Sequence, residues 1–362
     1  MELNRCFRVI APLAAIAMVA AAGLVRPASL HAGDPPWDPP PCPPGHPSAG
    51  TGAAWYSLEP VLDANGWLSG RRLVLGDLAG TVTRRLDLPP ESFASGPVDG
   101  RVLVGDDDGT RSRLRVVDVA AGCAVELGRE ASVVRSGVLA ADGGVAWEHR
   151  VNRATRADEG VWRRTHAGGG AVRVLPGLPV DAGYGPTFST ELLPAVDGRL
   201  AVASCGEERC RIRVLDPATG HVARIDGTGP LLGLERGRAI AYAVCAGLPC
   251  AVESIDLESG RRTTLVADAG PAALAVAARP ALVHERPDGR LETVDLVTLR
   301  RTLLAGHGPG SPVRVGSMAT GGADVPAGRV LVAPGGGFAD PDAVRVVDTG
   351  TGTVAPAREV RP

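Results

Sequence analysis

The chain has 362 residues and a formal net charge of −2, and all 38 of its basic residues are arginine because it contains no lysine. Without lysine there is no phosphate-loop lysine, no pyridoxal Schiff base and no kinase-type strand lysine. The near-neutral balance also argues against nucleic acid as a partner, since binding it requires a clustered basic surface. With 44% hydrophobic residues, the chain is expected to bury a substantial core.

The N-terminus has the layout of a secretory signal peptide. Two arginines in residues 1–8 precede an apolar stretch of 17 residues, and small residues then offer a cleavage site after Ala32 or, alternatively, after Ala22. A retained membrane anchor is the other interpretation, which Pro12 and the short apolar length disfavour. We therefore expect residues 1–32 to be removed, no membrane span to remain, and the protein to be secreted or otherwise extracytoplasmic.

A proline-rich arm is predicted over residues 33–52. Eight prolines lie within residues 34–47. Because proline fixes φ and lacks an N–H group, the arm is expected to be extended rather than helical or part of a sheet. It is either a spacer or a strap held by Cys42.

A repeat dominates residues 53–362. Seven related segments share one position, and the steps between copies are 39 to 53 residues. Apolar residues alternate within each copy and turn residues recur about every ten positions, which indicates strands. Four antiparallel strands per unit predict an all-β fold, a single seven-bladed β-propeller, with six or eight blades as alternatives. The shared positions are Asp77, Asp118, Thr165, Asp216, Asp256, Asp295 and Asp348.

The third turn of each unit reads D-x-x-[ST]-G in its clearest copies. There the aspartate can accept hydrogen bonds from turn amides, and glycine takes the left-handed position. We therefore interpret the recurring aspartates as turn caps rather than catalytic carboxylates. The first copy has a plausible second strand in residues 53–60 but no clear innermost strand, so the first blade is expected to be incomplete.

A resemblance follows from these repeats. The turns VLDPATG and SIDLESG, with the second strands VDGRLAV and ADGGVAW, resemble the broad group of TolB-type, WD-repeat-like and quinoprotein-like propellers. The resemblance covers most of residues 53–355 and implies the fold but no activity. The chain lacks the Ser-Pro before Asp-Gly of TolB-type repeats, the Trp-Asp of WD repeats and the regular tryptophan of quinoprotein blades. No subfamily is assigned, and no cofactor is expected.

Cysteines carry the most specific local pattern, because two C-x4-C pairs lie in consecutive units. In each pair, one cysteine is expected to end a strand and the other to begin the next strand. The two then face each other across a hairpin and form a disulfide, as suits a secreted chain. A structural zinc site made by all four is the alternative, and the splaying of neighbouring blades disfavours it. The two remaining cysteines are predicted to pair and pin the arm. The predicted disulfides are Cys205–Cys210, Cys245–Cys250 and Cys42–Cys123.

A ligand is best sought on the loop face, the side where the turns between second and third strands and the connections between blades emerge. Asp106 to Asp108 lack the alternating spacing of a calcium loop, so we interpret them as an acidic hairpin tip and assign no metal site. Trp147 and Trp162 are expected to pack on each other across the longest of these turns, with a sugar-stacking platform as the alternative. The candidate ligand-face residues are Asp106, Asp107, Asp108, Trp147, Arg153, Asp158, Trp162, Glu207 and Glu208.

The sequence contains no recognised catalytic motif. No serine lies in G-x-S-x-G, no glycine run fits a dinucleotide loop, and the seven histidines are scattered. The sequence therefore favours a secreted, monomeric, non-enzymatic propeller scaffold that presents one loop face to a protein or glycan. The alternative is an extracytoplasmic propeller hydrolase or lyase with polar residues at the central channel, which no sequence motif need announce.

Overall fold

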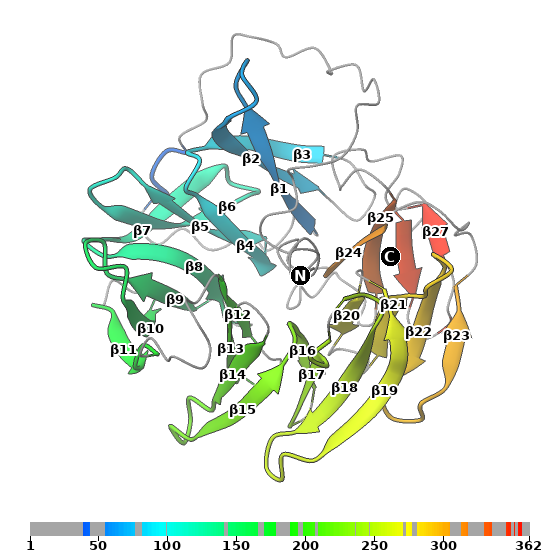
Figure 1. The fold of residues 1–362 in the computed structure, drawn as a ribbon. Coiled ribbons are helices and arrows are strands. Elements are labelled where there is room, and N and C mark those ends of the chain that lie inside the picture. Colours follow the sequence, from blue (N-terminus) through cyan, green and yellow to red (C-terminus); the bar gives the residue numbers. More distant parts are fainter. Residues whose placement is uncertain are drawn as a thin grey trace.

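The described residues of the computed structural model form seven antiparallel sheets around a common centre, like the blades of a propeller (Figure 1). In the described part of the chain, the first sheet has three strands and the other six have four. The all-β propeller expected from the repeat is confirmed. The structure describes residues 39–43, 55–76, 82–98, 100–140, 144–165, 170–178, 189–194, 198–206, 209–235, 237–245, 247–270, 273–276, 281–304, 313–317, 329–334, 345–348, 351 and 354–356.

Within each sheet the strands follow chain order, from the inner strand to the outer one. The first three sheets consist of β1 (Trp55–Leu62), β2 (Leu68–Gly76), β3 (Val82–Leu88); β4 (Phe93–Val98), β5 (Arg101–Asp107), β6 (Ser112–Asp118), β7 (Cys123–Glu130); and β8 (Val133–Leu139), β9 (Val145–Val151), β10 (Asp158–Thr165), β11 (Val172–Leu175). The fourth and fifth consist of β12 (Ser189–Pro194), β13 (Leu200–Cys205), β14 (Cys210–Leu215), β15 (Val222–Thr228); and β16 (Leu231–Glu235), β17 (Arg238–Tyr242), β18 (Cys250–Asp256), β19 (Arg262–Ala269). The last two consist of β20 (Ala273–Val276), β21 (Ala281–Glu285), β22 (Leu291–Asp295), β23 (Arg301–Leu303); and β24 (Val313–Ser317), β25 (Arg329–Pro334), β26 (Arg345–Asp348), β27 (Val354–Pro356).

The core is a series of apolar layers between neighbouring sheets. Side chains alternate between the two faces of a strand, so each sheet contributes to two layers. Ile212, for example, is fully buried in the layer between the fourth and fifth sheets, whereas Val202 is fully buried in the layer between the third and fourth. A polar side chain at such a position is therefore buried between two blades.

The recurring aspartates cap the turn between the third and fourth strands. Oδ1 of Asp216 accepts hydrogen bonds from the backbone N–H groups of Ala218 and Thr219 at 2.9 and 3.3 Å. These bonds stabilise the ionised carboxylate and hold the pKa of Asp216 below its ordinary value. Equivalent bonds are made by Asp118, Asp256 and Asp295. The interpretation as turn caps is confirmed for these four, whereas Asp77 lies outside the described residues.

Leu299 occupies the left-handed position that glycine holds in equivalent turns. Its φ is 58°, close to 71° at Gly220 and 69° at Gly260. Burial offsets little of the steric cost, because the leucine is 51% exposed. We expect Leu299→Gly to raise the free energy of unfolding by about 1 kcal/mol in urea denaturation. Gly260→Leu is the matched control and should lower it similarly, and a destabilised Leu299→Gly would contradict the strain argument.

The proline arm is fixed to the outer edge of the second sheet. Cys42 and Cys123 form a disulfide, with their Cα atoms 4.9 Å apart. Beside it, the N–H of Cys42 donates to the carbonyl of Ala124 at 3.0 Å, and the N–H of Ala124 donates to the carbonyl of Pro40 at 2.9 Å. The arm is thus a strap where it is described, and it covers the beginning of β7, an edge strand.

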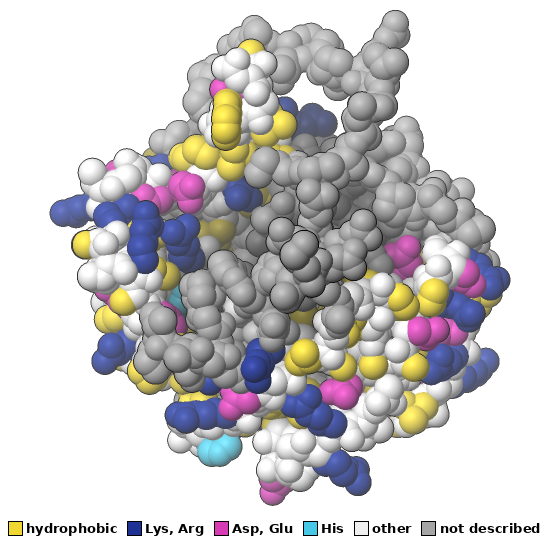
Figure 2. Space-filling view, in the orientation of Figure 1, with side chains coloured by type: hydrophobic (Ala, Val, Ile, Leu, Met, Phe, Trp, Pro, Cys, Tyr) yellow, Lys and Arg dark blue, Asp and Glu magenta, His cyan; other side chains and the backbone are white. Residues whose placement is uncertain are grey.

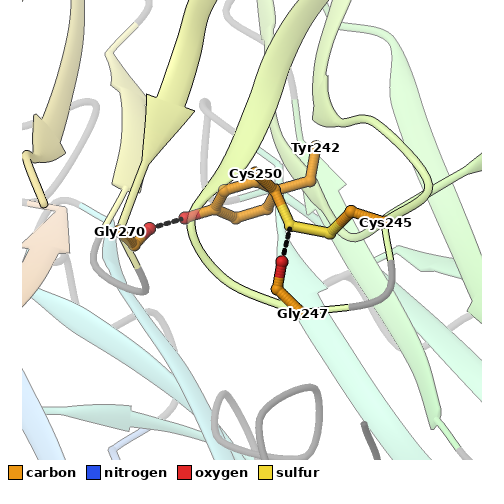
Figure 3. Close-up of a disulfide and its surroundings, with 5 residues drawn as sticks. All are labelled: Tyr242, Cys245, Gly247, Cys250 and Gly270. Carbon is orange, nitrogen blue, oxygen red and sulfur yellow. Dashed lines mark hydrogen bonds between the residues drawn. A yellow bond between two sulfur atoms is a disulfide. The ribbon is translucent and has the colours of Figure 1, made fainter.

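The two C-x4-C pairs form disulfides with different geometries. Cys205 and Cys210 end β13 and begin β14 directly opposite each other, with Cα atoms 4.0 Å apart. Cys245 and Cys250 also pair, but their Cα atoms are 6.1 Å apart (Figure 3). The expectation that Cys245 ends a strand is wrong, because β17 stops at Tyr242 and the loop is correspondingly wider. Since all four sulfurs are in disulfides, the zinc alternative has no support.

Candidate functional site

A groove of about 330 Å³ lies on the loop face, between the first and second sheets. The end of β3 forms one wall, and the other wall is formed by β5, β6, β7 and the turn between β5 and β6. Basic and acidic side chains gather over this part of the molecule (Figure 2). The lining residues are Asp87, Leu88, Pro89, Asp106, Asp107, Asp108, Arg111, Arg113, Arg115 and Arg129.

The register of the second sheet brings the groove arginines together. Arg113 and Arg115 are two residues apart on β6, so their side chains point to the same face. Arg113 lies opposite Asp106 on β5 and opposite Arg129 on β7. The three strands therefore present a row of charged side chains toward the first sheet.

Asp106 is shared by two arginines at the base of the groove. Its two carboxylate oxygens accept hydrogen bonds from Nε and Nη2 of Arg113, each at 3.2 Å. Oδ2 also accepts a hydrogen bond from Nη2 of Arg115 at 2.6 Å. The side chains of Asp106 and Arg115 are only 10% and 9% exposed, so salt screens this pair little. Asp106 is thus a fixed part of the groove floor rather than an exposed acidic tip.

Asp107 and Asp108 hold the loop in place. Asp107 accepts hydrogen bonds from Nη2 of Arg153 in the third sheet at 2.7 Å and from the Ser112 hydroxyl at 2.5 Å. Burial alone would raise the pKa of Asp107, but these bonds outweigh it and the pKa lies below its ordinary value. The Thr110 hydroxyl and the backbone N–H groups of the turn lower the pKa of Asp108 to about 2. Both carboxylates are ionised at neutral pH and committed to local structure.

Arg111 and Arg129 form the exposed cationic part of the groove. Among the described side chains, none is hydrogen-bonded to the guanidinium of Arg111. Arg129 pairs with Glu126 at 3.0 Å, and both side chains are well exposed, so this ion pair holds the arginine only weakly. An acidic group entering the groove would therefore meet these two arginines first.

Trp147 and Trp162 do not pack on each other, contrary to expectation. Trp147 lies opposite Arg163 and Trp162 lies opposite Glu148, so the indoles are one register step apart and point to opposite faces of the third sheet. Trp147 is only 4% exposed, in the layer toward the fourth sheet, and offers no platform for a sugar. Trp162 faces the second sheet, where the guanidinium carbon of Arg150 lies 4.2 Å from its ring centroid.

The other candidate residues have structural partners. The structure brings Arg153 to Asp107, which ties the third sheet to the second. Asp158 lies 3.0 Å from Nε2 of His149 and accepts a hydrogen bond from the N–H of Leu178 at 2.8 Å. Burial would raise the pKa of Asp158, yet these hydrogen bonds hold it below its ordinary value. Asp158 does not line the groove. Outside the described residues lie Glu207 and Glu208.

Sequence reasoning missed a charged cluster buried between the second and third sheets. Arg150 and Arg164 each contact both Glu130 and Glu148. Glu148 is 1% exposed and Arg164 is 6% exposed. The sequence did contain a signal for this cluster, namely the charged and polar residues within the strand VAWEHRV. Because both faces of a blade strand are covered by neighbouring sheets, such residues are buried between blades and need charged partners there.

Neither a metal-ligand group nor a membrane-spanning helix is found in the described part of the chain. No set of three or more histidine, cysteine or acidic side chains there is arranged to hold a metal ion. No helix there is long and apolar enough to cross a bilayer.

Comparison with known proteins shows the fold. No protein-family model matches the chain, and no curated protein matches it. One of two structurally analysed prolyl endopeptidases aligns over 84% of this chain with 12% identity and a TM-score of 0.55, and the chain spans 49% of that protein. An oligogalacturonate lyase in complex with manganese aligns over 83% of this chain and 84% of its own, with 14% identity and a TM-score of 0.51. TolB from Acinetobacter baumannii aligns over 83% of this chain and 78% of its own, with 12% identity and a TM-score of 0.45.

The fold therefore defines the chain as a β-propeller. At 12% and 14% identity, the likenesses with TM-scores above 0.5 show the fold alone and assign no subfamily.

Proposed function

We propose that this chain is an extracytoplasmic, non-catalytic β-propeller that binds a protein or glycan partner bearing acidic groups through its loop face. The groove between the first and second sheets carries this proposal. Arg111 and Arg129 are exposed in it, whereas Arg113 is half-buried and Arg115 is buried. Guanidinium groups present a planar fork of donors that suits carboxylate, sulfate or phosphate groups.

The aspartates beside the groove do not cancel this preference. Asp107 is bound by Arg153 at 2.7 Å, and Asp87 is bound by Arg72 at 2.7 Å. Asp108 accepts hydrogen bonds from its own turn. Because these carboxylates are already occupied, an acidic ligand can reach Arg111 without displacing one of them. At Arg129 the ligand competes only with Glu126, whose exposed ion pair is weak.

The disulfides support an extracytoplasmic location. All six cysteines that follow the predicted leader are paired. Such bonds persist mainly in oxidising compartments. The predicted leader, residues 1–32, lies outside the described residues, so its removal stays a prediction.

A hydrolase or lyase site at the centre of the propeller is less well supported. Glu191, on the innermost strand β12, is the residue that favours it, because burial raises its pKa and a raised carboxyl pKa suits a general acid. Its cross-strand neighbours Ala203 and Ile212, however, belong to the apolar layer toward the fifth sheet. Acid–base hydrolysis of a sugar requires a second carboxylate. None of the described carboxylates is hydrogen-bonded or ion-paired to Glu191.

Binding of two acidic polymers tests the proposed function. Poly-L-glutamate represents an acidic protein segment, and alginate represents an acidic glycan. We expect the secreted protein to bind one of them, and the Arg111→Ser, Arg129→Ser double variant to lose about ten-fold or more in affinity, since two charge-assisted contacts are removed. Isothermal titration calorimetry at low and high salt measures this, and the salt dependence should weaken in the double variant.

The control is Arg224→Ser, which removes an exposed arginine of β15 outside the groove. It should bind like the unmodified protein. Binding of neither polymer, or equal binding by the double variant, would refute the groove as the binding site. Cleavage of either polymer would support the enzymatic alternative instead.

A further inference from the structure

The β1–β2 hairpin projects from the loop face beside the groove. β3 ends at Leu88, which pairs with Arg71, whereas β1 and β2 continue pairing as far as Leu62 and Leu68. With a rise of about 3.3 Å per residue, the hairpin extends about 10 Å past the end of β3. In Figure 1 it stands away from the ring of sheets.

The tip of this hairpin is apolar. Trp67 is 74% exposed, Leu62 is 48% exposed and Leu68 is 40% exposed. Hydrophobic side chains are visible at the end of the projection in Figure 2. Exposed apolar residues are usually scattered singly, so three in one seven-residue turn mark a contact surface. Leu62 and Leu68 face each other across the ladder, and Trp67 precedes Leu68, so the apolar side chains lie on both sides of the hairpin.

Several backbone groups of the tip are already hydrogen-bonded within the hairpin. The N–H of Asp63 donates to the carbonyl of Trp67 at 2.8 Å, and the N–H of Gly66 donates to the carbonyl of Asp63 at 3.0 Å. Oδ1 of Asp63 accepts from the N–H groups of Asn65 and Trp67, both at 2.9 Å. The Ser69 hydroxyl donates to the backbone carbonyl of Val61, on the other strand of the hairpin, at 3.0 Å. These polar groups therefore need no water, which is the condition for entering an apolar medium.

The charges of the hairpin are ordered along its length. Residues 61–70 contain one ionisable side chain, Asp63, whose carboxylate is used in the turn. The next charged residues are Arg71 and Arg72 on β2 and Glu59 on β1, which lies opposite Arg72, at the level where β3 ends. Tryptophan and leucine at the tip with arginines behind them match the interfacial zone of a bilayer, where indoles lie at headgroup depth and cations lie among the headgroups.

We propose that the β1–β2 hairpin is a membrane-surface anchor that inserts Leu62, Trp67 and Leu68 into the interfacial zone of a lipid bilayer. A narrow convex tip with apolar side chains on both sides suits a deformable lipid interface. A protein partner would have to enclose it in a matching deep pocket. Attachment through one such tip is reversible, and it turns the loop face with its groove toward the membrane. This inference does not depend on the groove binding an acidic ligand.

Partition into neutral phosphatidylcholine vesicles tests the anchor without engaging the arginines electrostatically. We expect the secreted protein to co-sediment with these vesicles, and the Trp67→Ser, Leu68→Ser double variant to lose about ten-fold or more in partition coefficient. Trp67→Phe should retain most of the binding. The control is Val172→Ser, which removes a 64% exposed hydrophobic side chain from β11 and should leave partition unchanged. Equal urea midpoints of all variants show that folding is intact.

Fluorescence gives a second readout that loss of stability would not mimic. Brominated phosphatidylcholine should quench indole emission in the unmodified protein, and most of that quenching should disappear in Trp67→Phe. No partition of the unmodified protein, unchanged partition of the double variant, or quenching that survives in Trp67→Phe would each overturn the anchor. Binding only to a soluble protein, with no vesicle partition, would also overturn it. The Arg111→Ser, Arg129→Ser variant should still bind these vesicles, so the two proposals fail separately.

Discussion

Replacing both Cys42 and Cys123 with serine is expected to lower the free energy of unfolding by about 4 kcal/mol. The two cysteines are 81 residues apart in the sequence, so their disulfide removes much of the conformational freedom of the unfolded chain. In the folded protein the same bond holds the arm against Ala124 at the edge of β7. Urea denaturation of the oxidised protein measures the loss, with coincident fluorescence and circular dichroism transitions as the test of two-state behaviour.

The matched control is the double variant Cys205→Ser, Cys210→Ser. Its disulfide spans a sequence separation of only 5, for which the same chain-entropy argument gives about 2 kcal/mol. The arm disulfide should therefore cost about twice as much to remove as the hairpin disulfide. Equal losses, or a larger loss for the hairpin disulfide, would show that loop closure in the unfolded chain is not the main way in which these disulfides stabilise the protein.

The propeller was predictable because its repeat has local causes. Alternating apolar residues specify strands, and the turn from Asp216 to Gly220 is stabilised by its own carboxylate and by a left-handed glycine. Each copy carries this information independently, so a unit can be recognised even when one position deviates, as Leu299 does. The first copy offers no clear innermost strand in the sequence, and among the described residues the first sheet has three strands.

The candidate site was less predictable because it depends on register and on packing between sheets. Trp147 and Trp162 lie one residue out of register between β9 and β10, so they point to opposite faces of the sheet. The length of the hairpin in the sequence does not reveal which residues pair. The groove requires the end of β3 to lie beside Arg113, a contact between two repeat units that the repeat itself does not encode. A recognisable signal existed, however, since SRLRVVD places arginines at alternate positions of a buried strand.

Arg164→Met is expected to lower the free energy of unfolding by about 3 kcal/mol at about pH 8. Arg164 lies between Glu130 and Glu148, with Nη2 3.3 Å from Oε1 of Glu148. Methionine can fill most of its volume but leaves Glu148, which is 1% exposed, with only Arg150 as a counter-charge. Removing one member of a buried ion cluster is costly because the remaining charge stays out of water. Urea denaturation of the variant and the unmodified protein measures the difference.

The pH dependence of this loss distinguishes a buried charge from a packing defect. Burial raises the pKa of Glu148 above its ordinary value even with both arginines present, and removing Arg164 should raise it further. A carboxyl group with a higher pKa in the folded state contributes stability at pH values below its unfolded pKa, and that contribution is lost as the pH rises through the folded pKa. The deficit of Arg164→Met relative to the unmodified protein should therefore shrink as the pH falls from about 8 to about 5.

An exposed ion pair provides the control for this cluster. Arg129→Met breaks the ion pair with Glu126, in which the arginine and glutamate side chains are 55% and 41% exposed. This substitution should lower the free energy of unfolding by less than about 0.5 kcal/mol at every pH in this range. A deficit for Arg164→Met that is constant with pH would indicate lost packing rather than an uncompensated carboxylate. A deficit that grows as the pH falls would mean that removing Arg164 lowers the pKa of Glu148, and it would contradict the argument that this guanidinium stabilises the buried carboxylate.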